Sequence, residues 1–270
     1  LIIGNVAGLA TNLSLLYNGW GVSSIAAGVL VRALVSSLGW SFSLLWVCRS
    51  AMGKSIRLRL SASEAKTLFR LAGYTLLAKL SSMLHTGSDN IVTGLVLGST
   101  HTAVLQLTSR IIDAARIVPD RIGAAMQPAL SSLFGENNDQ KSAQIAVKYL
   151  VCVSVMTGPL VAAAVGVNRE AITLWVGPHL FGGPFLSISF GLVLVTSIMT
   201  TAVYHILFSH GLIEVTAKAS LATGLAKILI LVIFMPMIGL PAVPLASLLA
   251  LLAVMVPTQF CYLNRISKLE

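Results

Sequence analysis

Long runs of apolar residues alternate with short polar joints along nearly the whole chain. A helix that crosses a bilayer needs about 20 mostly apolar residues, and eight runs reach or approach that length. We therefore predict an all-α integral membrane protein with about eight transmembrane helices. The predicted spans are approximately 1–16, 22–47, 68–96, 104–133, 147–167, 185–208, 217–238 and 242–263.

Composition agrees with this pattern. The chain is 56% hydrophobic and 10% charged, and its mean hydropathy is +0.88, values far from those of a soluble domain of this length. The net charge of +9 would also suit a nucleic-acid binder, but no nucleic-acid module is visible. Most of the excess lies in loops between spans, where anionic lipid headgroups are the natural neighbours.

Basic residues occur in alternate loops, and cytoplasmic loops carry an excess of Lys and Arg. The opposite set of loops holds only Arg169. We therefore predict that both ends of the chain face the cytoplasm. The basic loop residues are Arg49, Lys54, Arg57, Arg59, Lys66, Lys141, Lys218, Arg265 and Lys268.

The longest polar and basic interruption covers residues 49–66 and separates two spans from six. This segment is typical of a linker between helical bundles. The first apolar run lacks an initiating Met and is short for a full crossing. We therefore expect the chain to be a fragment whose upstream spans are missing.

Five charged residues fall within twelve positions of the fourth predicted span: Arg110, Asp113, Arg116, Asp120 and Arg121. At about 100° per residue they cover an arc of roughly 140° on one helix. Ionisable groups at membrane depth point into a bundle interior or a wet cavity rather than into lipid. The pattern therefore predicts a transport pathway beside this helix.

Two features leave this interpretation open. Pro119 lies within the stretch and would kink the helix, which breaks the regular phase and leaves open whether Asp120 and Arg121 share the face of the first three residues. The charges also stand at i,i+3 and i,i+4 spacing, so they could simply neutralise one another inside the bundle.

Further ionisable residues lie within other predicted spans. Arg32, Lys79 and Lys227 could contribute to the same cavity. Asp89 stands in the polar cluster of residues 85–90, where a carboxylate with neighbouring oxygens suits an ion site. The alternative is that this cluster breaks or caps a helix. The five histidines show no shared ligand spacing, so we predict no metal site.

The order of these residues and turns resembles the second half of a polysaccharide flippase of the multidrug/oligosaccharidyl-lipid/polysaccharide exporter superfamily. The resemblance covers residues 60–190 well and the remainder only through the spacing of spans. It rests on Asp89, Gly98, Arg110, Pro128 with Ser131 and Ser132, the acidic loop 136–139, Lys148 with Tyr149, and the segment ITLWVGPHLFGG at 172–183.

Members of this superfamily usually have twelve or more spans in two pseudo-symmetric six-helix bundles, with both termini cytoplasmic. The resemblance implies that residues 1–48 hold the last two spans of a truncated N-terminal bundle, 49–66 a cytoplasmic linker, and 67–270 the C-terminal six-helix bundle. It implies a transporter of the bacterial cytoplasmic membrane rather than an enzyme. The expected partners are membrane lipids and a polyprenyl-pyrophosphate-linked oligosaccharide.

On this interpretation the cationic side chains bind the pyrophosphate, because guanidinium groups meet phosphate oxygens through paired donors. The candidates are Arg110, Arg116, Arg121, Arg32, Lys79 and Lys227. Asp113 and Asp120 would prevent the cargo from binding too tightly. Relatives in the superfamily are commonly driven by H⁺ or Na⁺, and the candidate coupling carboxylates are Asp89, Asp113 and Asp120. No cofactor is expected.

Two other classes of function remain as alternatives. A multidrug and toxin extrusion antiporter carries cations and should have an acidic, aromatic cavity, whereas the charges within these spans are mainly basic. A membrane-embedded sugar or acyl transferase would need a His, Asp or Glu constellation at a membrane surface. The short loops of this chain do not supply one.

Overall fold

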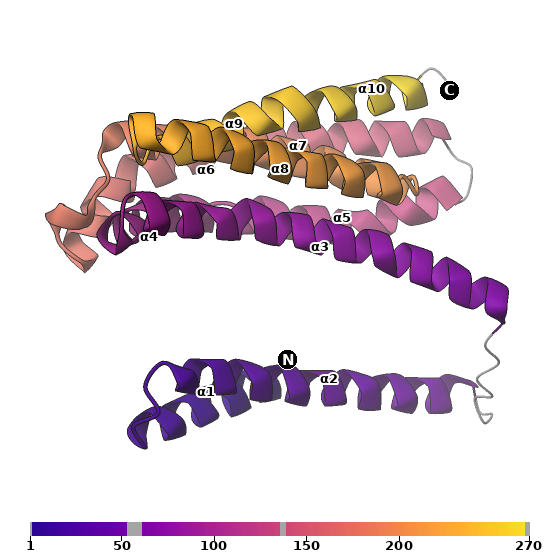
Figure 1. The fold of residues 1–270 in the computed structure, drawn as a ribbon. Helices are drawn as coiled ribbons and strands as arrows, with labels where there is room; N and C mark the ends of the chain where they lie inside the picture. The colour runs from indigo at the N-terminus through magenta and orange to yellow at the C-terminus, as the bar shows by residue number, and fades with distance from the viewer. Residues whose placement is uncertain (1, 53–60, 136–138, 268–270) are drawn as a thin grey trace. The chain divides into compact units, whose positions relative to one another are not determined.

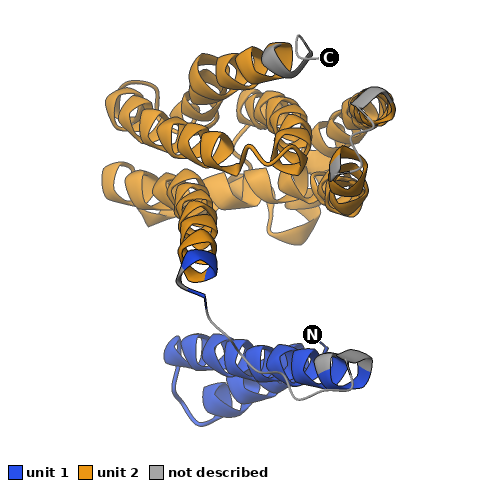
Figure 2. Cartoon of the chain, turned by 90° about the vertical axis from the view of Figure 1, so that its right-hand side faces the viewer, with its two compact units in different colours: residues 1–64 blue, residues 65–270 orange. Residues whose placement is uncertain are grey.

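The computed structural model describes residues 2–52, 61–135 and 139–267, and it has no strand in these ranges (Figure 1). The chain divides into two compact units, residues 1–64 and residues 65–270 (Figure 2). The all-helical fold class is therefore confirmed. The basic residues predicted at 54, 57, 59 and 268 and the acidic loop residues 136–138 lie outside the described ranges.

The first unit is a helical hairpin of α1 (Ile2–Tyr17) and α2 (Ser23–Met52). The two helices cross at Gly8 and Gly28, which are both buried. A Cβ added to either glycine would lie 2.8 Å from the carbonyl oxygen of the other. A side chain at either position would therefore clash with the backbone of the other helix. Small residues of this kind let membrane helices approach closely and gain contact area.

The second unit consists of a longer series of helices. They are orange in Figure 2, except for the first residues of α3, which belong to the first unit. They are α3 (Ala62–Val96), α4 (Ser99–Ala114), α5 (Ile117–Gly135), α6 (Asp139–Trp175), the 3₁₀ turn η1 (Pro178–Leu180), α7 (Pro184–Ser209), α8 (Ile213–Ile238), α9 (Ala242–Ala250), the π-helical segment η2 (Leu251–Met255) and α10 (Val256–Ser267).

Helix α7 is the centre of this unit, where it contacts α4, α5, α6, α8, α9 and α10. Its buried positions alternate between bulky residues such as Leu194 and Ile198 and small ones such as Gly191 and Ala202. The bulky residues join a core formed by α4, α5 and α6. The small residues let neighbouring helices approach closely, which is how membrane helices pack without a hydrophobic driving force between them.

Five described stretches are long and apolar enough to cross a membrane, judged by length and composition. They coincide with the predicted spans two, five, six, seven and eight, while α1 is a shorter apolar helix. The third and fourth predicted spans form α3, α4 and α5, which carry the charged residues discussed above. The five stretches are Ser23–Val47, Lys141–Trp175, Pro184–Ser209, Ile213–Ile238 and Ala242–Asn264.

The prediction of a single helix over 104–133, kinked at Pro119, is wrong, because the chain forms two helices there: α4 ends at Ala114 and α5 begins at Ile117. At the break the amide of Arg116 donates to the carbonyl of Asp113, three residues back, at 3.1 Å. Pro119 explains why the helix breaks here. It has no N–H, and in a continuous helix its ring would clash with the carbonyl four residues back. In the first turn of α5 neither restriction applies.

The last predicted span is also irregular. The π-helical segment η2 separates α9 from α10 and precedes Pro257, which cannot donate to the carbonyl four residues before it. Short π-helical segments (π-bulges) within α-helices occur frequently at functional sites. Just beyond it, Gln259 Nε2 donates to the Thr200 carbonyl at 2.8 Å and ties α10 to α7.

Candidate functional site

A cavity of about 630 Å³ lies within the second unit, between α3, α5, α7, α8 and the π-helical segment η2. On α8 its lining runs from Ile213 to Thr223, ten residues apart, which corresponds to about 15 Å along the helix. The cavity therefore extends from the middle of the bundle to the end that carries the α7–α8 turn. This is also the end at which α10 finishes (Figure 1).

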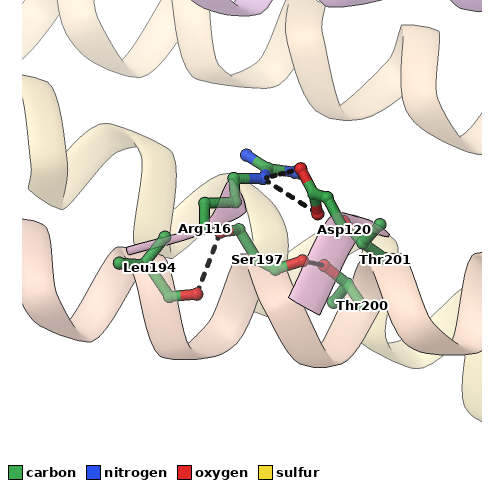
Figure 3. A network of polar contacts seen from close by, with 6 residues as sticks. All are labelled: Arg116, Asp120, Leu194, Ser197, Thr200 and Thr201. Atoms are coloured by element: carbon green, nitrogen blue, oxygen red, sulfur yellow. Dashed lines mark hydrogen bonds and ion pairs between the residues drawn. The ribbon is translucent and has the colours of Figure 1, made fainter. Parts of the chain in front are cut away.

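Arg116 points into the cavity from the break between α4 and α5. Its Nε lies 3.1 Å from Asp120 Oδ2, and its Nη2 donates to Thr201 Oγ1 on α7 at 3.1 Å (Figure 3). The two charged side chains are 40% and 42% exposed, so water and ligands reach the pair. Because a guanidinium has five N–H donors, Arg116 retains free donors for an anion.

Lys79 is the second basic residue of the cavity lining and comes from α3. Its side chain is exposed. Arg116 and Lys79 therefore stand against one carboxylate, Asp120, among the described lining residues. The cavity is net basic, as a site for an anionic group requires.

Hydroxyl groups and aromatic rings form much of the remaining lining. The aromatic rings are those of Tyr74, Tyr204, Phe208 and His85. The hydroxyl side chains come from α3, α7 and α8 and are those of Thr75, Ser81, Ser82, Thr86, Ser197, Thr200, Thr201, Thr216, Ser220 and Thr223. The cavity is thus polar on several sides although it lies in an apolar bundle.

A second ion pair lies one helical turn beyond the inner end of the cavity. Lys227 on α8 is 1% exposed and its Nζ lies 2.8 Å from both carboxylate oxygens of Asp89 on α3, which is 17% exposed. Hydrogen-bond geometry is met for Oδ2, and Nζ also donates to the His85 carbonyl. His85 and Thr223, which line the cavity, precede Asp89 and Lys227 by four residues.

Buried oxygens with unmet hydrogen-bonding capacity belong to this pair or lie close to it in the sequence. Ser88 Oγ, Asp89 Oδ1 and Thr93 Oγ1 are buried and make no hydrogen bond within the described part of the chain. The carboxylate can take up a proton, and the three oxygens can coordinate a small cation. Over the described residues no group of three or more His, Cys, Asp or Glu side chains is placed to hold a metal ion.

The structure distributes the remaining predicted site residues over other surfaces. Arg110 and Asp113 are exposed on α4 and Arg121 is exposed on α5, and none of the three lines the cavity. Arg32 belongs to the first unit, where it lines a smaller hollow of about 430 Å³ between α1 and α2, together with Asn5 and other residues. Of the nine predicted residues, Lys79, Arg116 and Asp120 share the cavity.

Sequence reasoning missed the hydroxyl-bearing residues of the cavity. A usable signal was present, because Ser197, Thr200 and Thr201 on α7 recur at helical spacing within an otherwise apolar span, as do Thr216, Ser220 and Thr223 on α8. Residues three or four apart share one face of a helix. The pattern was therefore that of a polar stripe.

Solved structures of MATE transporters have this fold. A MATE transporter in the bent conformation aligns with a TM-score of 0.73 and 17% identity, over 99% of this chain and 61% of that one. An outward-facing multidrug resistance MATE family transporter of the MOP superfamily aligns with a TM-score of 0.74 and 20% identity, over 99% and 62%. The chain thus has the MATE transporter fold and spans about three fifths of the length of these structures.

The family is established by sequence. The family model described as polysaccharide biosynthesis protein matches residues 1–179, and the chain belongs to this family. No curated protein matches the chain. The predicted resemblance to the polysaccharide flippase family is confirmed, and the chain is a multi-pass membrane protein.

Proposed function

We propose that the chain is part of a transporter that moves a polyprenyl-pyrophosphate-linked oligosaccharide across the bacterial cytoplasmic membrane by alternating access. The family and the MATE transporter fold support this proposal. The observation that carries it is the half-exposed guanidinium of Arg116, which faces a cavity of about 630 Å³ together with Lys79.

The cargo presents a physical problem that this cavity addresses. A pyrophosphate with attached sugars cannot cross about 30 Å of hydrocarbon unaided, whereas its prenyl tail is stable in lipid. Arg116 supplies charge-assisted donors to the phosphate oxygens, and Lys79 supplies a second positive charge. Asp120 holds the guanidinium in place and limits the net charge, so that the cargo can also leave.

The position of the cavity supports loading from the cytoplasmic leaflet. Its lining reaches the α7–α8 turn, and the basic residue Lys218 lies near this end of α8. By the distribution of basic loop residues this end faces the cytoplasm. The cavity would then receive the cargo on the side where its glycan is assembled.

For the coupling ion, H⁺ or Na⁺, we favour Asp89 over the two other candidate carboxylates. Asp120 is held by Arg116, and Asp113 is exposed outside the cavity. Asp89 is mostly buried, lies one turn beyond the cavity and has the unpartnered oxygens of Ser88 and Thr93 nearby. Lys227 would neutralise the carboxylate whenever the ion has left, because a bare charge is costly at membrane depth.

Depletion of the protein in its host tests the transport proposal. A failed flippase leaves finished lipid-linked oligosaccharide on the inner leaflet of the cytoplasmic membrane, which a membrane-impermeant lectin or enzyme can measure in vesicles of known orientation. A failed transferase instead leaves the glycan incomplete. Finished lipid-linked oligosaccharide in normal amounts on the outer leaflet would refute the proposal.

A cation antiporter is the second candidate, because one structure with this fold is that of a multidrug resistance transporter. Such a pump requires a net acidic cavity, whereas Arg116 and Lys79 outnumber Asp120 in the described lining. In the depletion experiment an antiporter would change sensitivity to cationic drugs and leave the lipid-linked oligosaccharide unaffected.

A further inference from the structure

Most of the Ser and Thr hydroxyl groups that line the cavity share one hydrogen-bonding arrangement. Six of them donate to a carbonyl of their own helix, three or four residues back. For example, Thr200 Oγ1 donates to the Ser197 carbonyl at 3.0 Å and Thr223 Oγ1 to the Ala219 carbonyl at 2.8 Å. The six are Thr75, Thr86, Ser197, Thr200, Thr216 and Thr223.

This arrangement determines what the hydroxyl groups can bind. A hydroxyl has one hydrogen to donate and two lone pairs that accept. Once the hydrogen is committed to a helix carbonyl, the oxygen can only accept. We call these six residues the acceptor wall, because they line the cavity from α3, α7 and α8 and their hydroxyl oxygens keep only acceptor capacity.

The acceptor wall distinguishes the two polar parts of a lipid-linked oligosaccharide. Sugar hydroxyl and amide groups carry hydrogens that acceptors can bind. A pyrophosphate at neutral pH offers mainly acceptor oxygens, so it gains no hydrogen bond from the wall. The donors that a pyrophosphate needs are instead those of Arg116 and Lys79.

Aromatic rings near the α7–α8 end of the cavity add to this selectivity. Tyr204 and Phe208, one turn apart on α7, have ring centroids 5.8 Å apart, and both line the cavity. The apolar C–H faces of a sugar ring pack on such surfaces, while its hydroxyl groups reach polar neighbours. A hydrated phosphate gains nothing from them.

We infer that the cavity of the second unit binds the glycan of the cargo through the acceptor wall, while Arg116 and Lys79 bind the pyrophosphate. The inference rests on the proposed function and deepens it. It makes the number of hydroxyl and amide donors on the glycan, rather than negative charge alone, the basis of cargo selection.

The test measures the affinity of the purified protein in lipid nanodiscs for two probes, bare polyprenyl pyrophosphate and the same lipid carrying a neutral disaccharide. The double variant Thr200→Val and Thr223→Val removes two acceptors and preserves side-chain shape. We expect it to bind the disaccharide probe about tenfold more weakly and the bare probe as the wild type does. Arg116→Ala should weaken both probes.

Two control variants separate recognition from folding. Thr157→Val removes the same type of hydrogen bond, from Thr157 Oγ1 to the Val153 carbonyl at 2.7 Å, at a buried position that does not line the cavity. It should bind both probes as the wild type does. Thr200→Ser with Thr223→Ser keeps both acceptors and should retain affinity for the disaccharide probe.

Several results would overturn the inference. Equal losses for the two probes in the valine variant, or no loss for either, would show that the acceptor wall does not recognise the glycan. Wild-type protein that binds only one of the probes would refute the division between glycan and pyrophosphate sites. If neither probe bound, the inference would fail, and the depletion experiment would show whether the proposed function fails with it.

Discussion

The two ion pairs of the second unit differ most clearly in how far water reaches them. The side chains of Arg116 and Asp120 are about two fifths exposed, whereas Lys227 is 1% and Asp89 17% exposed. Exposed pairs of this kind contribute about 0–1 kcal/mol and exchange partners readily. Buried pairs cannot lose one member cheaply. The first pair can therefore release its guanidinium to a ligand, whereas the second cannot lose one member without a large loss of stability.

The sequence predicted that the ionisable residues within the predicted spans avoid lipid, because a charged group at membrane depth is costly. It did not predict their partners. Lys227 and Asp89 are 138 residues apart, and no local spacing indicates that they meet. For the same reason it gave Arg110 and Arg116 similar roles, although only Arg116 lines the cavity.

Replacement of Lys227 by Met should lower the free energy of unfolding by about 3–5 kcal/mol, because Asp89 is then left charged, buried and unpaired. The double variant Lys227→Met with Asp89→Asn should recover much of this loss, since no uncompensated charge remains. Thermal unfolding of the protein in detergent micelles measures both values. A single variant as stable as the wild type would contradict the pairing.

At the scale of elements, apolar run lengths placed most helices close to their observed positions, because a bilayer admits few other structures. The prediction failed where a proline within a run marked a helix start rather than a kink. Pro119 belongs to the first turn of α5, and only the arrangement of Ala115 and Arg116 at the break reveals this. The path of the chain there directs Arg116 into the cavity while Arg110 stays on α4.

The hairpin of α1 and α2 yields a stability prediction. Gly28→Ala places a Cβ 2.8 Å from the Gly8 carbonyl oxygen, a backbone atom that can move only with its helix. We expect a loss of about 1–3 kcal/mol from this overpacking. Gly39→Ala on the same helix meets nothing within 4 Å and serves as the matched control.

Tryptophan fluorescence during thermal unfolding can report on this hairpin selectively. Trp20, Trp40 and Trp46 lie in the first unit, and Trp175 can be replaced by Phe. A transition shifted to lower temperature in Gly28→Ala but not in Gly39→Ala is the expected result. Equal transitions in the two variants would show that the helices do not cross at this glycine.

At the scale of the whole molecule, the alternation of basic loops predicts an orientation that neither helix packing nor the fold comparison supplies. Arg169 belongs to one set of loops between the predicted spans. The larger basic set, including Lys141 and Lys218, belongs to the opposite set of loops. The cavity reaches the end of the second unit near Lys218. The proposed loading of cargo from the cytoplasmic leaflet depends on this orientation.

Reporter fusions at the carboxyl end of the chain test the orientation. Green fluorescent protein matures in the cytoplasm and alkaline phosphatase is active only outside it. We expect the first fusion to fluoresce and the second to be inactive, because the basic loops are retained in the cytoplasm. The opposite pair of results would place the cavity mouth on the outer face of the membrane.

The central claim is that Arg116 faces the cargo from within the cavity, and one measurement tests it most directly. The amount of finished lipid-linked oligosaccharide on the inner leaflet is compared between cells producing Arg116→Ala and cells producing Arg121→Ala, at equal protein levels. Both variants remove one guanidinium from the same region, but the Arg121 side chain is exposed and does not line the cavity.

We expect Arg116→Ala to reduce export by about tenfold or more, because a charge-assisted hydrogen bond to phosphate contributes about 1.5–3 kcal/mol. The Arg121→Ala cells should export as the wild type does. Normal export in Arg116→Ala cells, or an equal defect in the two variants, would contradict the account.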